Sequence, residues 1–558
     1  MEKVWLKQYP EGIKSEIDVD PETSIVDVLQ RSCSRFANKT AYINMDHGIS
    51  YAQLDQYSQA FASFLQHELG FAKGDRVALM MPNLLQYPVA LFGILRAGMV
   101  AVNVNPLYTA RELEHQLSDA SVRGIVIIEN FAETLEKVID KVPLEAVITT
   151  QVGDMLGFPK RVLTNLVVKH VKKMVPSFNL PGAITFNDAL KRGQARAMDP
   201  VDVSGEDIAF LQYTGGTTGL AKGATLLHRN IVANLEQASA WLEPWTTEGE
   251  ETIVTPLPLY HVFALTANCL VFLKLGGTNV LITNPRDIPG LAKELKKYKV
   301  TAFTGVNTLF NALLNDKDFC SLDFSPLKLT LGGGAAVQRA VAEQWKEVTG
   351  KPLIEAYGLT ETSPAACINP LSMEDYNGSI GLPLPSTEVS IRDDDGKEVA
   401  SGKTGELCIR GPQVMAGYWN KPEENKKTFF EDGFLRTGDV AKMDEKGFFF
   451  IVDRKKDMIL VSGFNVFPNE IEDVVSGHEG VLEAACIGVP DKKSGEAVKV
   501  FIVKKDDSAT AESIRAYCKD KLTGYKMPKH IEFLDELPKS NVGKILRKEL
   551  RDLKPAAA

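Results

Sequence analysis

The sequence predicts an α/β protein in which helix-covered parallel sheets come first, a β-rich subdomain follows and an α+β segment ends the chain. Through the first two-thirds, short β-branched runs alternate with longer stretches of helical spacing, as in parallel sheets covered by helices. From about residue 379 the pattern changes to short strands with turn signals, such as DDDGKE at 393–398. The segment after Asp453 ends in a basic stretch of helical character, 544–554.

Individual elements follow from the same patterns. Strands are expected at 120–128, 146–150 and 279–283, and helices at 111–118 and 290–298. The highly charged run DRKKD at 453–457 is typical of an exposed linker. We therefore expect a large N-terminal domain, 1–453, with its β-rich subdomain at about 379–453, and a C-terminal domain, 454–558.

Length, composition and charge exclude several classes of protein. A chain of 558 residues is too long for one compact core, and 24% charged with 44% hydrophobic residues is typical of a globular protein rather than a disordered or collagen-like one. The net charge of −9 argues against nucleic acid as a partner, because phosphate-backbone binding needs a broad basic surface.

Cysteines and hydropathy indicate the compartment. Seven cysteines, none in a C-x-x-C pair, predict neither a zinc site nor a redox dithiol and are typical of reduced thiols in the cytoplasm. The first twenty residues have no apolar core, and the most hydrophobic stretch, 88–104, is interrupted by Arg96. We expect no signal peptide and no membrane span.

One segment is basic in this acidic chain. Residues 155–187 contain no Asp or Glu but include five Lys or Arg residues. As a helix, 160–174 places Leu163, Leu166, Val167, Val171 and Met174 on one face, with Lys169 and Lys172 opposite and Lys173 at the border. Such a helix lies either on an anionic membrane surface or, more plainly, with its apolar face packed on the protein's own core.

A glycine- and threonine-rich loop is the sharpest chemical signal. It reads YTGGTTGLAKG, from Tyr213 to Gly223, directly after an apolar strand at 208–211. Glycines let backbone N–H groups approach an anion, threonine hydroxyls add donors and Lys222 adds a charge, so the loop predicts a triphosphate cradle. It is not a Walker loop, because Ala221 precedes Lys222 and Gly223 follows it.

Six further motifs follow in a fixed order: PLYHVF at 258–263, GGG at 332–334, YGLTE at 357–361, RTGD at 436–439, DRKKD at 453–457 and NVGK at 541–544. With these motifs the whole chain resembles the adenylate-forming superfamily of acyl-CoA synthetases, adenylation domains and firefly luciferase. Within it, the sequence is most similar to bacterial long-chain fatty acid–CoA ligases. The resemblance implies two helix-covered sheets in the large domain and a mobile, rotating C-terminal domain.

The resemblance also implies the reaction. ATP converts a long-chain fatty acid to an acyl-adenylate with release of pyrophosphate, and coenzyme A then displaces AMP, with Mg²⁺ assisting the first step. Fatty acid degradation would use the product. We expect peripheral association with the inner face of the cytoplasmic membrane, and a homodimer stays open.

Site residues are carried over motif by motif. Catalytic roles are implied for Lys544, which would bridge the acyl carboxylate and the α-phosphate, for His261, which would orient the carboxylate or thioester, and for Thr214 and Glu361, which would bring in Mg²⁺. Lys456 would be the hinge. The residues implied in nucleotide or coenzyme A binding are Tyr213, Thr214, Gly215, Gly216, Thr217, Thr218, Gly219, Lys222, Gly333, Gly334, Tyr357, Thr360, Asp439, Arg454 and Gly463.

Plainer interpretations stay open. Tyr357 would otherwise be a core aromatic and His261 a structural histidine. Lys544 would otherwise be part of a solvated basic helix with Arg547, Lys548 and Arg551. The acyl pocket is expected between 263–275, which is predicted to be helical, 304–314 and 332–337. Three alternative functions stay open. One is a fatty acyl-AMP ligase that loads a carrier protein, although such enzymes carry an extra insertion before the hinge that is missing here. The others are a medium-chain acyl-CoA synthetase and a nucleotide-binding sensor that catalyses no reaction.

Overall fold

Two large sheets form the bulk of the N-terminal part in the computed structural model, which describes residues 3–214, 221–540 and 542–553. The first sheet has the order β16-β15-β14-β13-β12-β10-β11-β1-β2 and is parallel from β1 to β14. Its strands are β1 Thr40–Asn44, β2 His47–Ser50, β10 Thr252–Thr255, β11 Thr278–Leu281, β12 Ala302–Gly305, β13 Leu329–Gly332, β14 Ile354–Gly358, β15 Ala365–Ile368 and β16 Leu382–Pro383.

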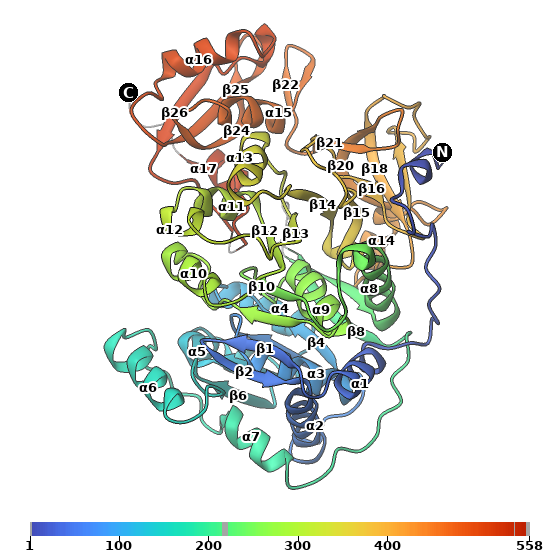
Figure 1. Cartoon of the computed structure of the whole chain (residues 1–558), viewed down its shortest axis with the longest axis vertical. Coiled ribbons are helices and arrows are strands. Elements are labelled where there is room, and N and C mark those ends of the chain that lie inside the picture. The colour runs from blue at the N-terminus through green and yellow to red at the C-terminus, as the bar shows by residue number, and fades with distance from the viewer. Residues whose placement is uncertain (1–2, 215–220, 541, 554–558) are drawn as a thin grey trace.

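The second sheet has the order β19-β9-β8-β4-β3-β5-β6-β7. Its strands are β3 Arg76–Met80, β4 Val100–Asn103, β5 Gly124–Ile128, β6 Ala146–Thr150, β7 Ile184–Thr185, β8 Ile208–Thr214, β9 Lys222–Leu227 and β19 Gly417–Tyr418. Helices cover both sheets (Figure 1): α1 Ile25–Arg35, α2 Tyr51–His67, α3 Gln86–Arg96, α4 Ala110–Asp119, α5 Ala132–Glu136, α6 Lys160–Leu166, α7 Phe186–Gly193, α8 His228–Leu242, α9 Val271–Lys274, α10 Ile288–Leu295, α11 Asn307–Leu314, α12 Lys317–Cys320 and α13 Arg339–Thr349.

Two smaller sheets complete the fold and confirm the predicted class. The β-rich subdomain is an antiparallel sheet with α14 Pro422–Thr428 beside it; its strands are β17 Glu388–Arg392, β18 Gly405–Arg410, β20 Leu435–Met443 and β21 Phe449–Arg454. The C-terminal part stands at one end of the molecule (Figure 1) and contains β22 Ile459–Val461, β23 Phe464–Val466, α15 Pro468–Ser476, β24 Val481–Asp491, β25 Gly495–Lys504, α16 Ala511–Lys519, β26 His530–Leu534 and α17 Arg547–Asp552. The boundary between 453 and 454 stays a prediction.

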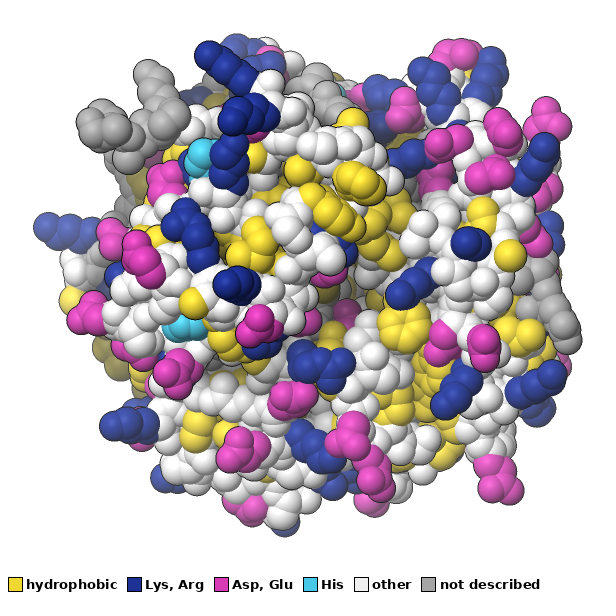
Figure 2. All heavy atoms as spheres, turned by 90° about the horizontal axis from the view of Figure 1, so that it is seen from above, with side chains coloured by type: hydrophobic (Ala, Val, Ile, Leu, Met, Phe, Trp, Pro, Cys, Tyr) yellow, Lys and Arg dark blue, Asp and Glu magenta, His cyan; other side chains and the backbone are white. Residues whose placement is uncertain are grey.

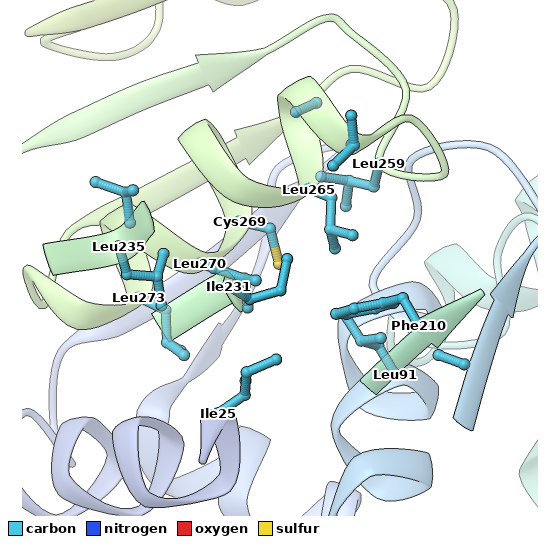
Figure 3. Close-up of a cluster of buried hydrophobic side chains, with 14 of the residues drawn as sticks. Ile25, Leu91, Phe210, Ile231, Leu235, Leu259, Leu265, Cys269, Leu270 and Leu273 are labelled. Carbon is cyan, nitrogen blue, oxygen red and sulfur yellow. The ribbon is translucent and has the colours of Figure 1, made fainter. Parts of the chain in front are cut away.

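A hydrophobic core fixes the helices that approach the site. Figure 3 shows Ile25 of α1, Leu91 of α3, Phe210 of β8 and Ile231 of α8 facing Leu265, and these side chains are fully buried in one cluster. Leu265 belongs to a π-helix, η6 Ala264–Leu270, that runs directly into α9. Burying such aliphatic side chains stabilises the fold by about 1.5–3 kcal/mol each, so η6 is held firmly beside the sheet.

Several element predictions were right in kind but wrong in extent. The expected strand 120–128 begins only at Gly124, because Ser121 has a φ of 48° and the chain turns there. The predicted helix 263–275 is π-helical before it becomes α9. The C-terminal helix begins at Arg547 rather than 545, because the Leu546 N–H is already bonded to the Pro538 carbonyl, 2.8 Å away.

The surface and the hydropathy agree with the composition. Seen from above, acidic and basic side chains are interspersed over the face shown in Figure 2. In the part of the chain that the structure describes, no helix combines the length and the apolarity needed to cross a membrane. All seven cysteines are free, and only Cys320 is not fully buried.

Candidate active site

A cavity of about 2010 Å³ is lined by residues of the N-terminal part, including its β-rich subdomain, and by residues of the C-terminal part. The structure brings to it most of the residues singled out in the sequence: Tyr213, Thr214, Lys222, His261, Gly333, Gly334, Tyr357, Thr360, Glu361, Asp439, Arg454, Lys456 and Lys544. Gly215, Gly216, Thr217, Thr218 and Gly219 lie outside the described residues. Segments more than three hundred residues apart therefore meet in one space.

Lys544 reaches into this cavity from the C-terminal part. A Cβ built on Gly334 would lie 3.3 Å from Cε of Lys544, so the missing side chain at Gly334, whose φ is 77°, makes room for the lysine. Burial, followed by the positive charge of Arg454, lowers the pKa of Lys544 to about 8. The lysine is thus a desolvated cation whose charge is available to an anionic substrate.

The two arginines after Lys544 do not form a solvated basic face. Arg547 donates to both carboxylate oxygens of Glu472, at 3.0 and 2.7 Å, and its guanidinium lies 3.4 Å from Asp453. Arg551 donates to Asp457 at 2.7 Å. The two arginines are therefore paired with carboxylates rather than free in solvent, whereas Lys548 is exposed.

Asp439 of β20 is contacted by Tyr357 of β14 and by Arg454 of the neighbouring strand β21. The Tyr357 hydroxyl donates to Oδ2 of Asp439 at 2.6 Å, and Nε of Arg454 lies 3.4 Å from Oδ1. Asp439 and Arg454 are register partners in the β20–β21 ladder, which explains why motifs fifteen residues apart act at one point. Asp439 is only 5% exposed, so its carboxylate is a directed acceptor rather than a surface charge.

The phosphate-loop ends are placed by a hairpin. Thr214 and Lys222 are paired across β8 and β9. Nζ of Lys222 donates to Glu424 of α14 at 2.5 Å and lies 4.8 Å from the ring centre of Tyr418. The Tyr213 hydroxyl donates to Oδ2 of Asp119 at 2.7 Å. Lys222 is therefore paired with a carboxylate from α14.

His261 is held as a neutral imidazole. Burial, and then the charge of Lys544, lower the pKa of His261 to about 3. Its Nδ1 accepts the backbone N–H of Phe263 at 3.4 Å, which assigns the ring proton to Nε2. A neutral imidazole of this kind donates a hydrogen bond from Nε2, but it is too weak a base to accept a proton from a thiol.

The cavity lining also includes apolar residues. The expected segments contribute Phe263, Thr304 and Val337 to the lining. Sequence reasoning missed one face of α8, with Ala238 and Leu242 four residues apart, and strand residues from β10, β13 and β15; these are Ile253, Leu329, Leu331 and Ile368. The helical spacing of apolar residues in α8 could have indicated from the sequence that this face lines the cavity.

Other lining residues were also missed. The Tyr418 hydroxyl donates to Oε1 of Glu361 at 2.6 Å. Glu355 is 6% exposed, and its Oε1 accepts the Val337 N–H at 3.2 Å, while burial raises its pKa to about 8. An acidic residue in an otherwise apolar strand, two positions before Tyr357, could have indicated this buried carboxyl.

Two further predictions concern the linker and the hairpin after it. Lys456 lines the cavity, and burial lowers its pKa to about 8. Gly463 lies at the turn between β22 and β23 with a φ of 85°, is exposed and is not part of the cavity. The hinge role and the coenzyme A contact stay predictions.

Comparison with known proteins gives a consistent result. A family model described as AMP-binding enzyme matches residues 29–419, and one described as AMP-binding enzyme C-terminal domain matches 470–544. The long-chain-fatty-acid–CoA ligase of Escherichia coli O157:H7 is 60% identical over 552 residues, 99% of this chain and 98% of the relative. That of Bacillus subtilis (strain 168) is 40% identical, with 98% of each covered.

Solved structures share the arrangement of the whole chain. The anthranilate CoA ligase AuaEII in complex with anthranoyl-AMP has a TM-score of 0.85 at 27% identity, covering 96% of this chain and 98% of that one. ATP-bound MatB from Rhodopseudomonas palustris has a TM-score of 0.80 at 29% identity, covering 95% and 99%. Both structures hold a nucleotide or an adenylate, as their descriptions state.

Proposed function

This chain belongs to the AMP-binding enzyme family, and from that premise we propose that it is a long-chain fatty acid–CoA ligase that works through an acyl-adenylate. One observation carries the proposal: Lys544 of the C-terminal part lines one cavity with a polar region that includes Asp439 and an apolar region that includes Ala238 and Leu242 of α8. A fatty acid and ATP would meet at the junction of these two regions.

The first step joins two anions. A carboxylate oxygen of the fatty acid attacks the α-phosphorus of ATP, an acyl–oxygen–phosphorus bond forms, and pyrophosphate leaves. Catalysis of such a step depends on positioning and on neutralising charge. Lys544 is suited to this task because it lines the cavity and is desolvated there, and the charged groups that act on it are Arg454, Asp439 and Glu361. Asp439 would accept hydrogen bonds from the ribose hydroxyls, with Tyr357 against adenine.

The second step uses the thiol of coenzyme A. The sulfur attacks the carbonyl carbon, a thioester forms, and AMP leaves as the acyl–oxygen bond breaks. His261, neutral and protonated on Nε2, would orient the carbonyl oxygen by donating a hydrogen bond. A general base is not required of it, since a thiol of ordinary pKa already supplies a few per cent thiolate at neutral pH.

The residues present fit a magnesium ion that is bound mainly by the nucleotide. Mg²⁺ takes one or two protein oxygens together with substrate phosphates. Thr214 and Glu361 supply a hydroxyl and a carboxylate at the cavity, and the described residues contain no cluster of three His, Cys, Asp or Glu that would form a complete protein site. When bound, the ion would neutralise charge on the phosphates and orient them.

We also infer that the chain is a cytoplasmic enzyme that binds reversibly to an anionic membrane surface. The exposure of apolar side chains in the basic segment supports this proposal: Leu163 is 65%, Val171 74% and Met174 54% exposed, whereas Val167 is half-buried. The segment consists of α6 and a π-helical turn, 167–171, and lies at the periphery of the molecule (Figure 1). A homodimer stays a prediction.

The test is a panel of acids from acetate to oleate, assayed for pyrophosphate release and for thioester with and without coenzyme A. We expect the highest kcat/KM with long-chain acids and thioester formation only with coenzyme A. Acyl-adenylate that accumulates and is not released by coenzyme A would indicate an acyl-AMP ligase, and an optimum at medium chain length would indicate a medium-chain synthetase. No pyrophosphate release from any acid would contradict the proposal.

A further inference from the structure

Polar side chains of the large domain bind the loop that carries Lys544. Thr308, in the first turn of α11, donates from its hydroxyl to the Gly543 carbonyl oxygen at 2.9 Å. Asn311 donates from Nδ2 to the Leu482 carbonyl oxygen at 2.7 Å. Residues three apart lie on one face of a helix, so these two side chains present a single docking face of α11 to the C-terminal part.

A third side chain extends this docking face. Gln338 donates from Nε2 to the Ser476 hydroxyl at 2.9 Å. Its own position is fixed by Asn307, which donates to Gln338 Oε1 at 3.1 Å and accepts the Gln338 N–H at 2.9 Å. Gln338 is therefore held by the large domain on one side and contacts α15 on the other.

The approach at Thr308 depends on a glycine. A Cβ on Gly543 would lie 2.6 Å from Oγ1 of Thr308, closer than real Cβ contacts, and Gly543 has a φ of 76° that other residues rarely adopt. The glycine in the 541–544 motif thus allows the hydroxyl to contact the backbone immediately before the lysine.

Two hydrogen bonds tie the backbone of Lys544 to Ser540. The Ser540 N–H donates to the Lys544 carbonyl at 2.7 Å, and the Ser540 hydroxyl accepts the Lys544 N–H at 3.1 Å. The ion pair of Arg547 with Glu472 ties the next residues to α15. The position of the Lys544 backbone is therefore set by where the loop docks.

We propose that Thr308, Asn311 and Gln338 are positioning residues for adenylation, which hold the C-terminal part in the orientation that places Lys544 at the α-phosphate. The proposal rests on the proposed function. Electrostatic stabilisation of the transition state requires placement of the charged group to about 0.5 Å, and a lysine has a long, flexible side chain. Docking its backbone removes one source of this freedom.

The test separates the two half-reactions in matched variants. Thr308→Val keeps the shape but removes the donor, whereas Thr308→Ser keeps the hydroxyl and serves as control. Loss of one hydrogen bond of this kind should slow acyl-adenylate formation by about fivefold. The KM values for ATP and palmitate should stay unchanged, and thioester formation from supplied acyl-adenylate should keep its rate. Asn311→Leu, whose contact is to a different segment, should show the same pattern.

A structural readout accompanies the kinetics. Deuterium uptake of peptides covering 542–550 should rise in Thr308→Val and Asn311→Leu and stay at the wild-type level in Thr308→Ser. The proposal is overturned if Thr308→Val forms acyl-adenylate at the wild-type rate, or if both half-reactions slow equally with unchanged uptake. A wild-type enzyme that forms no acyl-adenylate from palmitate would instead contradict the proposed function.

Discussion

Tyr418 and Glu361 are joined by a hydrogen bond of 2.6 Å from the tyrosine hydroxyl to Oε1 of the carboxylate. Glu361 follows β14 and Tyr418 ends β19, so the bond links the two large sheets across the cavity. One oxygen of Glu361 is therefore oriented by a neutral donor. If Glu361 binds Mg²⁺ as proposed above, this hydrogen bond would hold the carboxylate in position for the ion.

Tyr418→Phe should therefore weaken the use of Mg²⁺. Removing the donor lets Glu361 rotate, and losses of this kind lower metal affinity by about tenfold or more. We expect the Mg²⁺ concentration for half-maximal pyrophosphate release to rise about tenfold, with activity largely restored at saturating Mg²⁺. A lower rate at every Mg²⁺ concentration with an unchanged midpoint would speak against this role of Tyr418.

Lys544→Ala should affect the first half-reaction specifically. Removing a buried charge from the site of in-line attack should slow acyl-adenylate formation by at least about a hundredfold. Conversion of supplied acyl-adenylate to thioester by coenzyme A should remain, since that step needs no charge at the α-phosphate. Equal losses in both half-reactions would show that the assigned role is wrong.

The sequence predicted the fold class and most of the residues that meet in the cavity, because these follow from strand–helix alternation and from short, ordered motifs. It did not predict the residues that hold them. Glu424 pairs with Lys222 across two hundred residues, and Tyr418 with Glu361 across fifty-seven, from segments without a recognisable motif. Such partners depend on tertiary packing, which local patterns do not encode.

The sequence also did not predict the type of one helix or the exposure of another. The apolar run 263–275 has the composition of an α-helix, but i→i+5 bonding in η6 depends on how its side chains pack in the core. For 160–174 the periodicity was clear, yet whether its apolar face is covered depends on neighbours that are distant in sequence. The structure leaves Leu163 and Val171 exposed.

Adenylation should lose activity above about pH 8. Lys544 has a pKa lowered to about 8, so it carries its charge below that pH and loses it above. The charged or titratable groups around it are Arg454, Asp439, Glu361 and His261, and with a pKa of about 3 His261 does not titrate in this range. kcat/KM for pyrophosphate release, which reports the free enzyme, should fall about tenfold per pH unit above the pKa.

Two variants identify the lysine whose deprotonation causes the loss of activity above pH 8. Lys544→Arg keeps a charge at all accessible pH values, so its slower reaction should show no decline above pH 8. Lys456 also has a pKa of about 8, and Lys456→Arg should leave the decline in place. If Lys456→Arg, and not Lys544→Arg, abolished the loss of activity above pH 8, Lys456 of the linker would be the titrating group instead.

Lys456→Pro tests the predicted hinge. Proline fixes φ near about −65° and restricts the preceding residue, so rotation at 455–456 should be hindered while the contacts seen in the cavity remain. Acyl-adenylate should still form, whereas thioester formation should collapse. Lys456→Ala is the control for the loss of the side chain and should retain most of both activities. A proline variant with the full overall rate would exclude Lys456 as the pivot.

Charge reversal of Lys169, Lys172 and Lys173 tests the membrane surface. Each basic residue near an anionic surface contributes on the order of 1 kcal/mol, so the three together should produce reversible, salt-sensitive binding. The matched control reverses Lys492, Lys493 and Lys505 of the C-terminal part, which are exposed and change the net charge equally. In co-sedimentation with anionic vesicles, the first triple variant should lose most of its binding and the control should keep it.

The apolar face of the same segment gives an independent arm of this test. Leu163→Ser with Val171→Ser leaves every lysine in place but removes side chains that are 65% and 74% exposed, so folding should be little affected. Binding should weaken in this variant too, because a helix at an interface needs both its charges and its buried apolar area. All variants should retain activity on a short, soluble acid, which reports an intact site. Unchanged vesicle binding in both arms would show that α6 is an ordinary exposed surface.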